Sequence, residues 1–145
     1  MAPVELITEQ FGTLAWDEAV GGYAGRADWR GHVVHLLLSC PDTGAPERAL
    51  QAAASLFREQ SAWAPRIIAL AVDELLVLKN RNWLEEGEAE LSRDAFLARM
   101  RLTGISIDGA GLFFFRHDDD DMFWGHDIVI SGTLAQGPMH ANLEG

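Results

Sequence analysis

The order of elements along the chain, strands followed by helices and then strands again, predicts an α+β fold with the helices packed on one face of an antiparallel sheet. Short apolar runs separated by turns fill residues 11–39, and the same pattern returns after residue 101. Between them, apolar residues recur at helical spacing over residues 47–79. We therefore expect three N-terminal strands, three to four C-terminal strands and two to three central helices, in a single domain spanning residues 1–145.

The N-terminal strands are expected at residues 11–16, 23–29 and 32–39, because each run is apolar and bounded by turn-forming residues. The second and third runs are separated only by Arg30 and Gly31. Glycine tolerates the positive φ that tight hairpin turns require, so this pair predicts a two-residue hairpin loop.

The central helices follow a linker at residues 41–46, which is rich in proline and glycine. An alanine-rich helix is expected over residues 47–62, with Pro46 suited to its first turn, and a strongly apolar core helix over about residues 65–79. Ser92 predicts the N-cap of a third, short helix that ends near Met100.

The C-terminal strands are expected at residues 102–107, 112–117 and 122–131, with a last short strand after a turn at residues 136–138. A turn centred between Asp119 and Asp120 would give three cross-strand pairs on one face of the sheet, namely His117 with Met122, Phe115 with Trp124 and Phe113 with His126. The same register places Phe114 opposite Gly125, where an aromatic ring would cover the bare backbone of glycine.

Composition restricts the class of function. The chain has 145 residues, 48% of them hydrophobic and 23% charged, which is typical of a globular protein. Its formal net charge of −11 argues against nucleic acid as a partner, since phosphate binding requires concentrated lysine and arginine. The N-terminal residues lack a secretory signal and no apolar run is long enough for a membrane span, so we expect a cytoplasmic protein that does not bind membranes.

The residues that could carry chemistry are concentrated in the last third of the chain. His117, Trp124 and His126 are the candidate ligand-site residues. The spacing of the histidines and aspartates matches neither a calcium-binding loop nor a zinc helix, so we predict no metal site, no cofactor and no catalytic residue. His32 and His35 show no spacing that ties them to the others. Cys40 is the only cysteine, and no base is identifiable beside it, so we expect an inert thiol.

Several phrases of the chain resemble a family of small bacterial proteins that is catalogued only as a domain of unknown function. The most distinctive is Phe-Trp-Gly-His within residues 120–132, and the others lie at residues 12–17, 28–31, 74–80, 83–84 and 137–145. Members usually have a shorter acidic turn than the four aspartates found here. The resemblance implies a bacterial protein and carries no activity. In size and charge the chain also loosely resembles the immunity proteins that neutralise bacterial toxins.

These observations favour a non-enzymatic acidic domain that binds another protein, with a basic protein as the favoured partner, in the manner of an immunity-like inhibitor of a basic toxin. The candidate contact residues are the carboxylates of two acidic segments, Glu85, Glu86, Glu88, Asp118, Asp119, Asp120 and Asp121. Two alternatives remain open. One is a small-ligand or metal-binding enzyme that uses the region of Trp124 and His126. The other is a structural homo-oligomeric module, possibly a homodimer formed at the exposed edge of the last strand.

Overall fold

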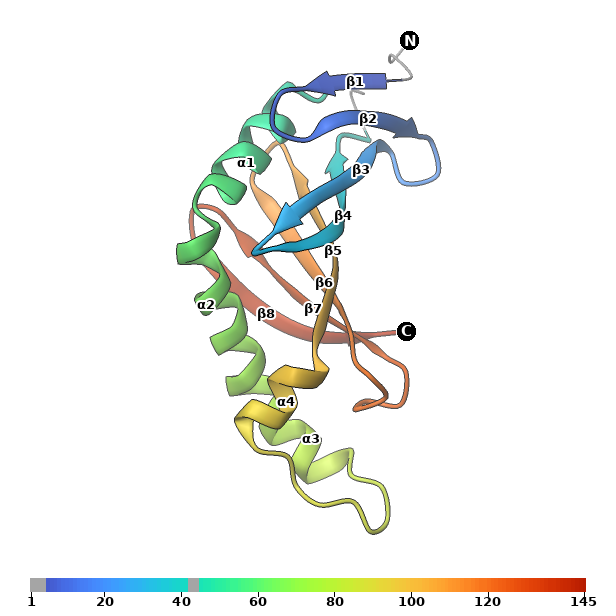
Figure 1. Cartoon of the computed structure of the whole chain (residues 1–145), viewed down its shortest axis with the longest axis vertical. Coiled ribbons are helices and arrows are strands. Elements are labelled where there is room, and N and C mark those ends of the chain that lie inside the picture. Colours follow the sequence, from blue (N-terminus) through green and yellow to red (C-terminus); the bar gives the residue numbers. More distant parts are fainter. Residues whose placement is uncertain (1–4, 42–44) are drawn as a thin grey trace.

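The computed structural model describes residues 5–41 and 45–145, so part of the expected linker, residues 42–44, lies outside the described residues. Eight strands form one sheet whose spatial order follows the sequence, and the strands are β1 (Glu5–Thr8), β2 (Gly12–Asp17), β3 (Gly22–Trp29), β4 (His32–Ser39), β5 (Arg101–Asp108), β6 (Leu112–Asp118), β7 (Asp127–Thr133) and β8 (Gly137–Glu144). The helices α1 (Glu47–Arg58), α2 (Gln60–Ala71), α3 (Val77–Asn82) and α4 (Arg93–Arg99) connect β4 to β5 and lie along one side of the sheet (Figure 1).

The expected antiparallel sheet of six to seven strands is wrong in two respects. The sheet has eight strands, because the four residues of β1, Glu-Leu-Ile-Thr, pair with β2 ahead of the first expected strand. Its central pair, β4 and β5, is parallel, whereas every other neighbouring pair is antiparallel. The helices return the chain from the end of β4 to the end of the sheet where β4 began, and β5 starts there. Such a crossover is the connection that parallel strands require. The architecture is therefore a mixed sheet with helices.

The hairpin between β3 and β4 is confirmed. Arg30 and Gly31 both have positive φ, at 55° and 87°, as a tight two-residue turn of the favoured hand requires. The carboxylate of Asp28 accepts a hydrogen bond from the Gly31 amide at 2.9 Å, and Gln60 on α2 accepts one from the Arg30 amide. The turn is thereby held against the helical layer.

The helices follow the predicted pattern with shifted ends. The first break lies at Glu59 rather than near residue 62, and Pro65 lies inside α2 instead of beginning it. A π-helical turn, Val72–Leu76, then joins α2 to α3. The Ser92 hydroxyl accepts a hydrogen bond from the Ala95 amide at 3.1 Å, so the predicted N-cap of α4 is confirmed. In the described part of the chain, no helix combines the length and the apolar character needed to cross a membrane.

The core lies between the helices and the face of the sheet that they cover. Alternate residues of β4, β5 and β6 point into it, including Val34, Leu36, Ile105, Phe113 and Phe115. On α1 and α2 the facing residues include Leu56, Phe57, Trp63 and Ile67. Aromatic rings meet edge to face in this core, with Trp29 of β3 touching Phe57 of α1 at a centroid distance of 5.1 Å and Phe115 of β6 at 5.0 Å. The opposite face of the sheet carries partly exposed side chains such as Phe114.

The expected register of the β6–β7 hairpin is wrong. His117 pairs with Ile128 rather than Met122, Phe115 with Ile130, and Phe113 with Gly132. Strand β7 begins only at Asp127, so the family phrase Phe-Trp-Gly-His lies in a loop, residues 119–126, and not in a strand. Gly125 has φ of 91° in this loop and does not face Phe114, whose partner is Ser131. Three consecutive hydrogen-bonded turns replace strand pairing in this loop, because the amides of Met122, Trp124 and His126 each donate a hydrogen bond to the carbonyl three residues earlier.

Candidate functional site

The four aspartates that the sequence presents as one acidic turn have different environments. Asp119 is buried, and its carboxylate accepts hydrogen bonds from the amides of Asp121, Phe123 and Gly125, at 3.2, 2.8 and 3.1 Å. Three backbone donors satisfy a carboxylate that would otherwise be costly to bury. Asp119 therefore fixes the shape of the loop at residues 119–126 from inside.

This loop displays an aromatic side chain at the surface. Trp124 is 55% exposed and has φ of 59°, a left-handed conformation that a bulky residue rarely adopts. Its ring meets that of Trp83 edge to face at a centroid distance of 4.7 Å. The His126 ring also contacts Trp83, and its Nδ1 lies 2.7 Å from the Phe123 carbonyl oxygen. Trp124 and His126 thus both contact Trp83, as parts of one aromatic group.

The two acidic segments predicted from the sequence lie side by side, joined through Arg99 of α4. The Arg99 guanidinium pairs with Asp120 at 3.0 Å and with Glu88 at 3.9 Å. Glu88 also pairs at 3.0 Å with Lys79, which is fully buried and donates a further hydrogen bond to the Trp83 carbonyl. A hydrogen bond from the Glu85 amide and the pairing with Lys79 lower the pKa of Glu88 below its usual value. Glu88 and Asp120 are consequently engaged within the fold.

Three of the predicted carboxylates stay exposed on the two segments whose rings, Trp83 and Trp124, are in contact. Glu85, Glu86 and Asp121 face solvent, and the carboxylates of Glu85, Glu86 and Asp121 form no ion pair within the described residues. The seventh predicted residue, Asp118, lies 3.8 Å from Arg101. We call the surface formed by Glu85, Glu86, Asp121 and Trp124 the acidic face.

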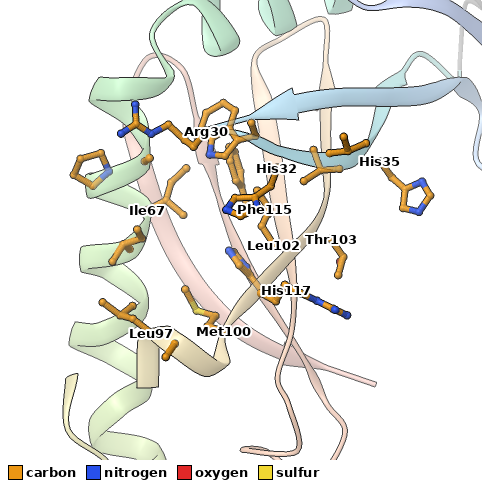
Figure 2. Close-up of a pocket in the computed structure, with 18 of the residues that line it drawn as sticks. Arg30, His32, His35, Ile67, Leu97, Met100, Leu102, Thr103, Phe115 and His117 are labelled. Carbon is orange, nitrogen blue, oxygen red and sulfur yellow. The ribbon is translucent and has the colours of Figure 1, made fainter. Parts of the chain in front are cut away.

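A second candidate site, which the sequence did not indicate, is a cleft where the central parallel strands diverge. Strands β4 and β5 pair only from His35 and Gly104 onward, so their first three residues are not paired with each other. The space between these unpaired strand ends, which we call the fork, opens into a cleft of about 1110 Å³. Helices α2 and α4 border the cleft on the helical side. Figure 2 shows Ile67, Leu97, Met100, Phe115 and His117 around this space, with the His35 ring directed away from it.

The cleft combines an apolar wall with basic side chains. The basic residues that line it come from β3, β4, their turn, α4 and β5, and they are Arg26, Arg30, His32, His35, Arg93 and Arg101. None of the described residues that line it is an aspartate or a glutamate. Arg30 donates a hydrogen bond to the Ser61 hydroxyl, and Arg101 has its distant contact with Asp118. The guanidinium groups of Arg26 and Arg93 have no carboxylate partner within the described residues.

His117 forms part of the cleft wall and is 5% exposed. Burial lowers its pKa from 6.5 to about 4, against the opposing effect of hydrogen bonds to the carbonyls of Ile128 and Phe115. The Nδ1 atom lies 3.3 Å from the Ile128 carbonyl oxygen, which favours the tautomer with the proton on Nδ1. His117 is therefore a neutral group at physiological pH.

The remaining candidates carry little chemistry. The described residues contain no group of three or more histidine, cysteine, aspartate or glutamate side chains that could hold a metal ion. Cys40 is buried, and burial together with the nearby Glu47 raises its thiol pKa. A thiol with a raised pKa is less reactive at neutral pH, because the thiolate is the nucleophile.

Sequence reasoning missed the cleft because its lining comes from segments far apart in the chain. Arg26, His32, Arg93, Arg101 and His117 lie on five different stretches, and no spacing joins them. One signal was present. Three of the four cleft arginines, Arg30, Arg93 and Arg101, flank predicted turns or helix ends rather than a charged helix face, in a chain with few basic residues, whereas Arg26 lies within an expected strand.

Comparison with known proteins gives the family and no more. No match was found among curated proteins or among solved structures. The sequence model of the family described as "Uncharacterized protein conserved in bacteria (DUF2262)" matches residues 8–143, which is nearly the whole chain. The predicted membership of a bacterial family of unknown function is confirmed, and the chain belongs to this family.

Proposed function

We propose that this protein is a non-enzymatic binding domain that docks a basic segment of another protein on its acidic face. The observation that carries the proposal is the presentation of Trp124. A large aromatic side chain is held in a left-handed backbone conformation at the surface, in a loop that also carries the exposed Asp121. Residues kept in such conformations persist only where the surrounding structure determines them, and they cluster at functional sites.

The surroundings of Trp124 support a preformed docking surface. Asp119 fixes the backbone of its loop through three amide hydrogen bonds. The Trp83 ring packs edge to face against the Trp124 ring. A rigid aromatic side chain loses little conformational entropy on binding, and tryptophan is enriched among the residues that dominate interface energies. Trp124 is the expected centre of the contact.

Charge supports a basic partner. The net charge is −11, and Glu85, Glu86 and Asp121 add local negative charge around Trp124. Such a surface accelerates the encounter with a positively charged partner, and the effect weakens as salt screens the charges. An inhibitor that covers the basic active site of a toxin is one specific form of this proposal, and a neighbouring toxin-like gene would supply the partner to test.

The test is binding of the purified chain to the purified product of a neighbouring gene, measured by surface plasmon resonance at several salt concentrations. The Trp124→Ala variant should weaken binding by about tenfold or more. The triple variant Glu85→Gln, Glu86→Gln, Asp121→Asn should lower the association rate and flatten its salt dependence.

Matched controls come from the far surfaces of the molecule. Phe114→Ala removes an exposed aromatic ring from the uncovered face of the sheet. The triple variant Glu9→Gln, Asp73→Asn, Glu74→Gln removes three exposed negative charges away from the acidic face. If the controls weaken binding as much as the acidic-face variants, this surface is not the docking site.

A second candidate function is self-association, because β8 is an edge strand of eight residues with one side unpaired in the sheet. Unpaired edges are templates for pairing with a second copy. Light scattering across a hundredfold range of protein concentration tests this. A constant monomer mass would exclude the homodimer.

A further inference from the structure

We propose that the cleft between β4 and β5 binds a small organic anion with an apolar body, such as a carboxylate or phosphate carried on an alkyl or aromatic group. The acidic face and this cleft are separate sites, because the cleft lies on the other side of α4, with Arg93 and Leu97 on its wall while Arg99 holds the acidic loops.

The first step of the argument is the separation of charge. The chain has 22 acidic and 11 basic residues, and ten of the basic residues are arginines. Four of these ten line one cleft, while none of its described lining residues is acidic. Guanidinium groups form strong, often paired hydrogen bonds with carboxylates and phosphates. A positive cleft in a negative molecule therefore selects an anion.

The second step is that two of these arginines are not used by the fold. The guanidinium groups of Arg26 and Arg93 have no hydrogen-bond or ion-pair partner within the described residues, and both side chains are exposed at the cleft. They approach the cleft from different elements, β3 and α4. An anion that reaches either guanidinium group from the cleft gains charge-assisted hydrogen bonds without breaking an ion pair of the described residues.

The third step is the apolar wall, which an inorganic anion would leave uncovered. Trp29, Ile67, Met100 and Phe115 line the cleft, and Val33 is 69% exposed beside it. His117 contributes a neutral ring instead of a charge, because burial lowers its pKa to about 4. Ligand sites typically combine an apolar lining with a few polar groups that fix orientation. The arrangement fits an amphipathic anion better than phosphate or acetate alone.

The fourth step is size. Clefts that bind small ligands usually measure roughly 300–1,000 Å³, and this open cleft measures about 1110 Å³. This is the volume of a cleft for a drug-sized ligand, so an anion that carries an alkyl chain is within its capacity. Because β4 and β5 are unpaired before His35 and Gly104, backbone groups inside the fork are also available to the ligand.

The experiment measures the binding of four probes to the intact chain by calorimetry and by amide chemical shifts. Each probe is used at concentrations below micelle formation. The probes are decanoate, acetate, decanol and decyltrimethylammonium, which share either the charge or the apolar chain. We expect decanoate to bind at least tenfold more tightly than each of the other three. The amide shifts should be largest at His32, Val33, Leu102 and Thr103, inside the fork.

Two double variants with the same change of charge locate the site. Arg26→Gln with Arg93→Gln removes the two unpartnered guanidinium groups of the cleft, and decanoate affinity should fall about tenfold or more. Arg58→Gln with Arg81→Gln removes two exposed arginines on α1 and α3 and should change the affinity less than twofold. Unfolding curves for both variants separate a loss of binding from a loss of the fold.

Several results would overturn the proposal. Equal affinity for decanol or decyltrimethylammonium would show that charge is not recognised, and equal affinity for acetate would show that the apolar wall is not used. No measurable binding of decanoate excludes this ligand class, and binding only to vesicles that contain anionic phospholipid would assign the cleft to a membrane surface instead. Because Trp124→Ala leaves the cleft intact, failure of the protein-docking proposal does not affect this one.

Discussion

Asp119 shows how one residue in a uniform run can differ from its neighbours. The sequence Asp118–Asp121 presents four identical side chains at a turn, yet only Asp119 is buried and accepts three amide hydrogen bonds. Asp118 and Asp120 lie near arginines, and Asp121 faces solvent without an ion pair within the described residues. The burial of a single carboxylate, rather than the number of aspartates, determines the path of the loop.

The substitution Asp119→Asn should therefore destabilise the protein by about 2–3 kcal/mol, because an amide group would direct a donor at backbone donors and lose the charge-assisted bonds. Urea unfolding followed by circular dichroism measures the change. Asp121→Asn is the matched control and should alter stability by less than about 0.5 kcal/mol. Equal effects of the two substitutions would contradict the structural role of Asp119.

His117 gives the molecule a dependence on pH with a definite sign. Burial lowers its folded pKa to about 4, whereas an unfolded histidine titrates near 6.5. Between these values the unfolded state binds more protons, so stability is complete above about pH 6.5 and falls as the pH drops toward 4. The loss approaches about 3 kcal/mol at the lower end of this range.

The variant His117→Gln removes this titration and keeps a polar side chain of similar size. The fall in unfolding free energy between pH 7.5 and pH 5 should be smaller in this variant than in the unaltered protein, by about 1–2 kcal/mol. Urea unfolding at the two pH values provides the measurement. Identical pH dependence in the two proteins would mean that His117 is not held neutral by burial.

At the scale of elements, the β3–β4 hairpin depends on the left-handed backbone conformation of its two turn residues, Arg30 and Gly31. Gly31 has φ of 87°, and a Cβ atom built there meets nothing within 4 Å. The substitution Gly31→Ala should therefore cost about 1 kcal/mol through backbone strain alone. Thermal or urea unfolding detects this loss.

Gly104 on β5 supplies the control, because its φ is outside the left-handed region and a Cβ atom would meet only ordinary contacts with His35 at 3.6 Å and beyond. Gly104→Ala should leave stability unchanged or raise it slightly, since alanine restricts the unfolded chain. A cost at Gly104 equal to that at Gly31 would show that space, and not the sign of φ, limits both positions.

Local chemistry explains which elements the sequence predicts well. Arg30-Gly31 and Ser92 act through bonds within a few residues, so the hairpin and the N-cap of α4 were predictable. The loop at residues 119–126 was not, because the apolar run Met122-Phe123-Trp124 lies shortly before the apolar residues 128–130 and the two runs together resemble one strand. Met122 and Phe123 are fully buried from a loop, and the buried carboxylate that permits this is not distinguishable in a run of four aspartates.

At the scale of the whole molecule, the unpredicted features are those that depend on which strands become neighbours. The mixture of strands and helices follows from periodicity, but the parallel contact of β4 with β5 arises only from the crossover of the helices. The cleft is a direct result of that contact, since it opens where these two strands diverge. Arg26 and Arg93 have no relation in sequence, and only the sheet order brings them to one site.

Net charge is a property of the whole chain, and it predicts how stability responds to salt. With 22 acidic and 11 basic residues, the formal net charge is −11, so repulsion among like charges opposes the compact state. Raising NaCl from about 10 to 150 mM shortens the screening length from roughly 30 to 8 Å. We expect the unfolding free energy to increase by an amount on the order of 1 kcal/mol, and the urea midpoint to rise accordingly.

The triple variant Glu9→Gln, Asp73→Asn, Glu74→Gln tests the cause, because it changes the net charge from −11 to −8 by removing three exposed carboxylates. Its midpoint should rise less with salt than that of the unaltered chain, since fewer repulsive pairs remain to be screened. A midpoint that falls with salt would mean that attraction in the exposed ion pairs, such as Arg116 with Asp127 and Glu144, outweighs the repulsion. The sign of the salt response therefore decides whether the excess negative charge destabilises the folded state or is offset by local ion pairs.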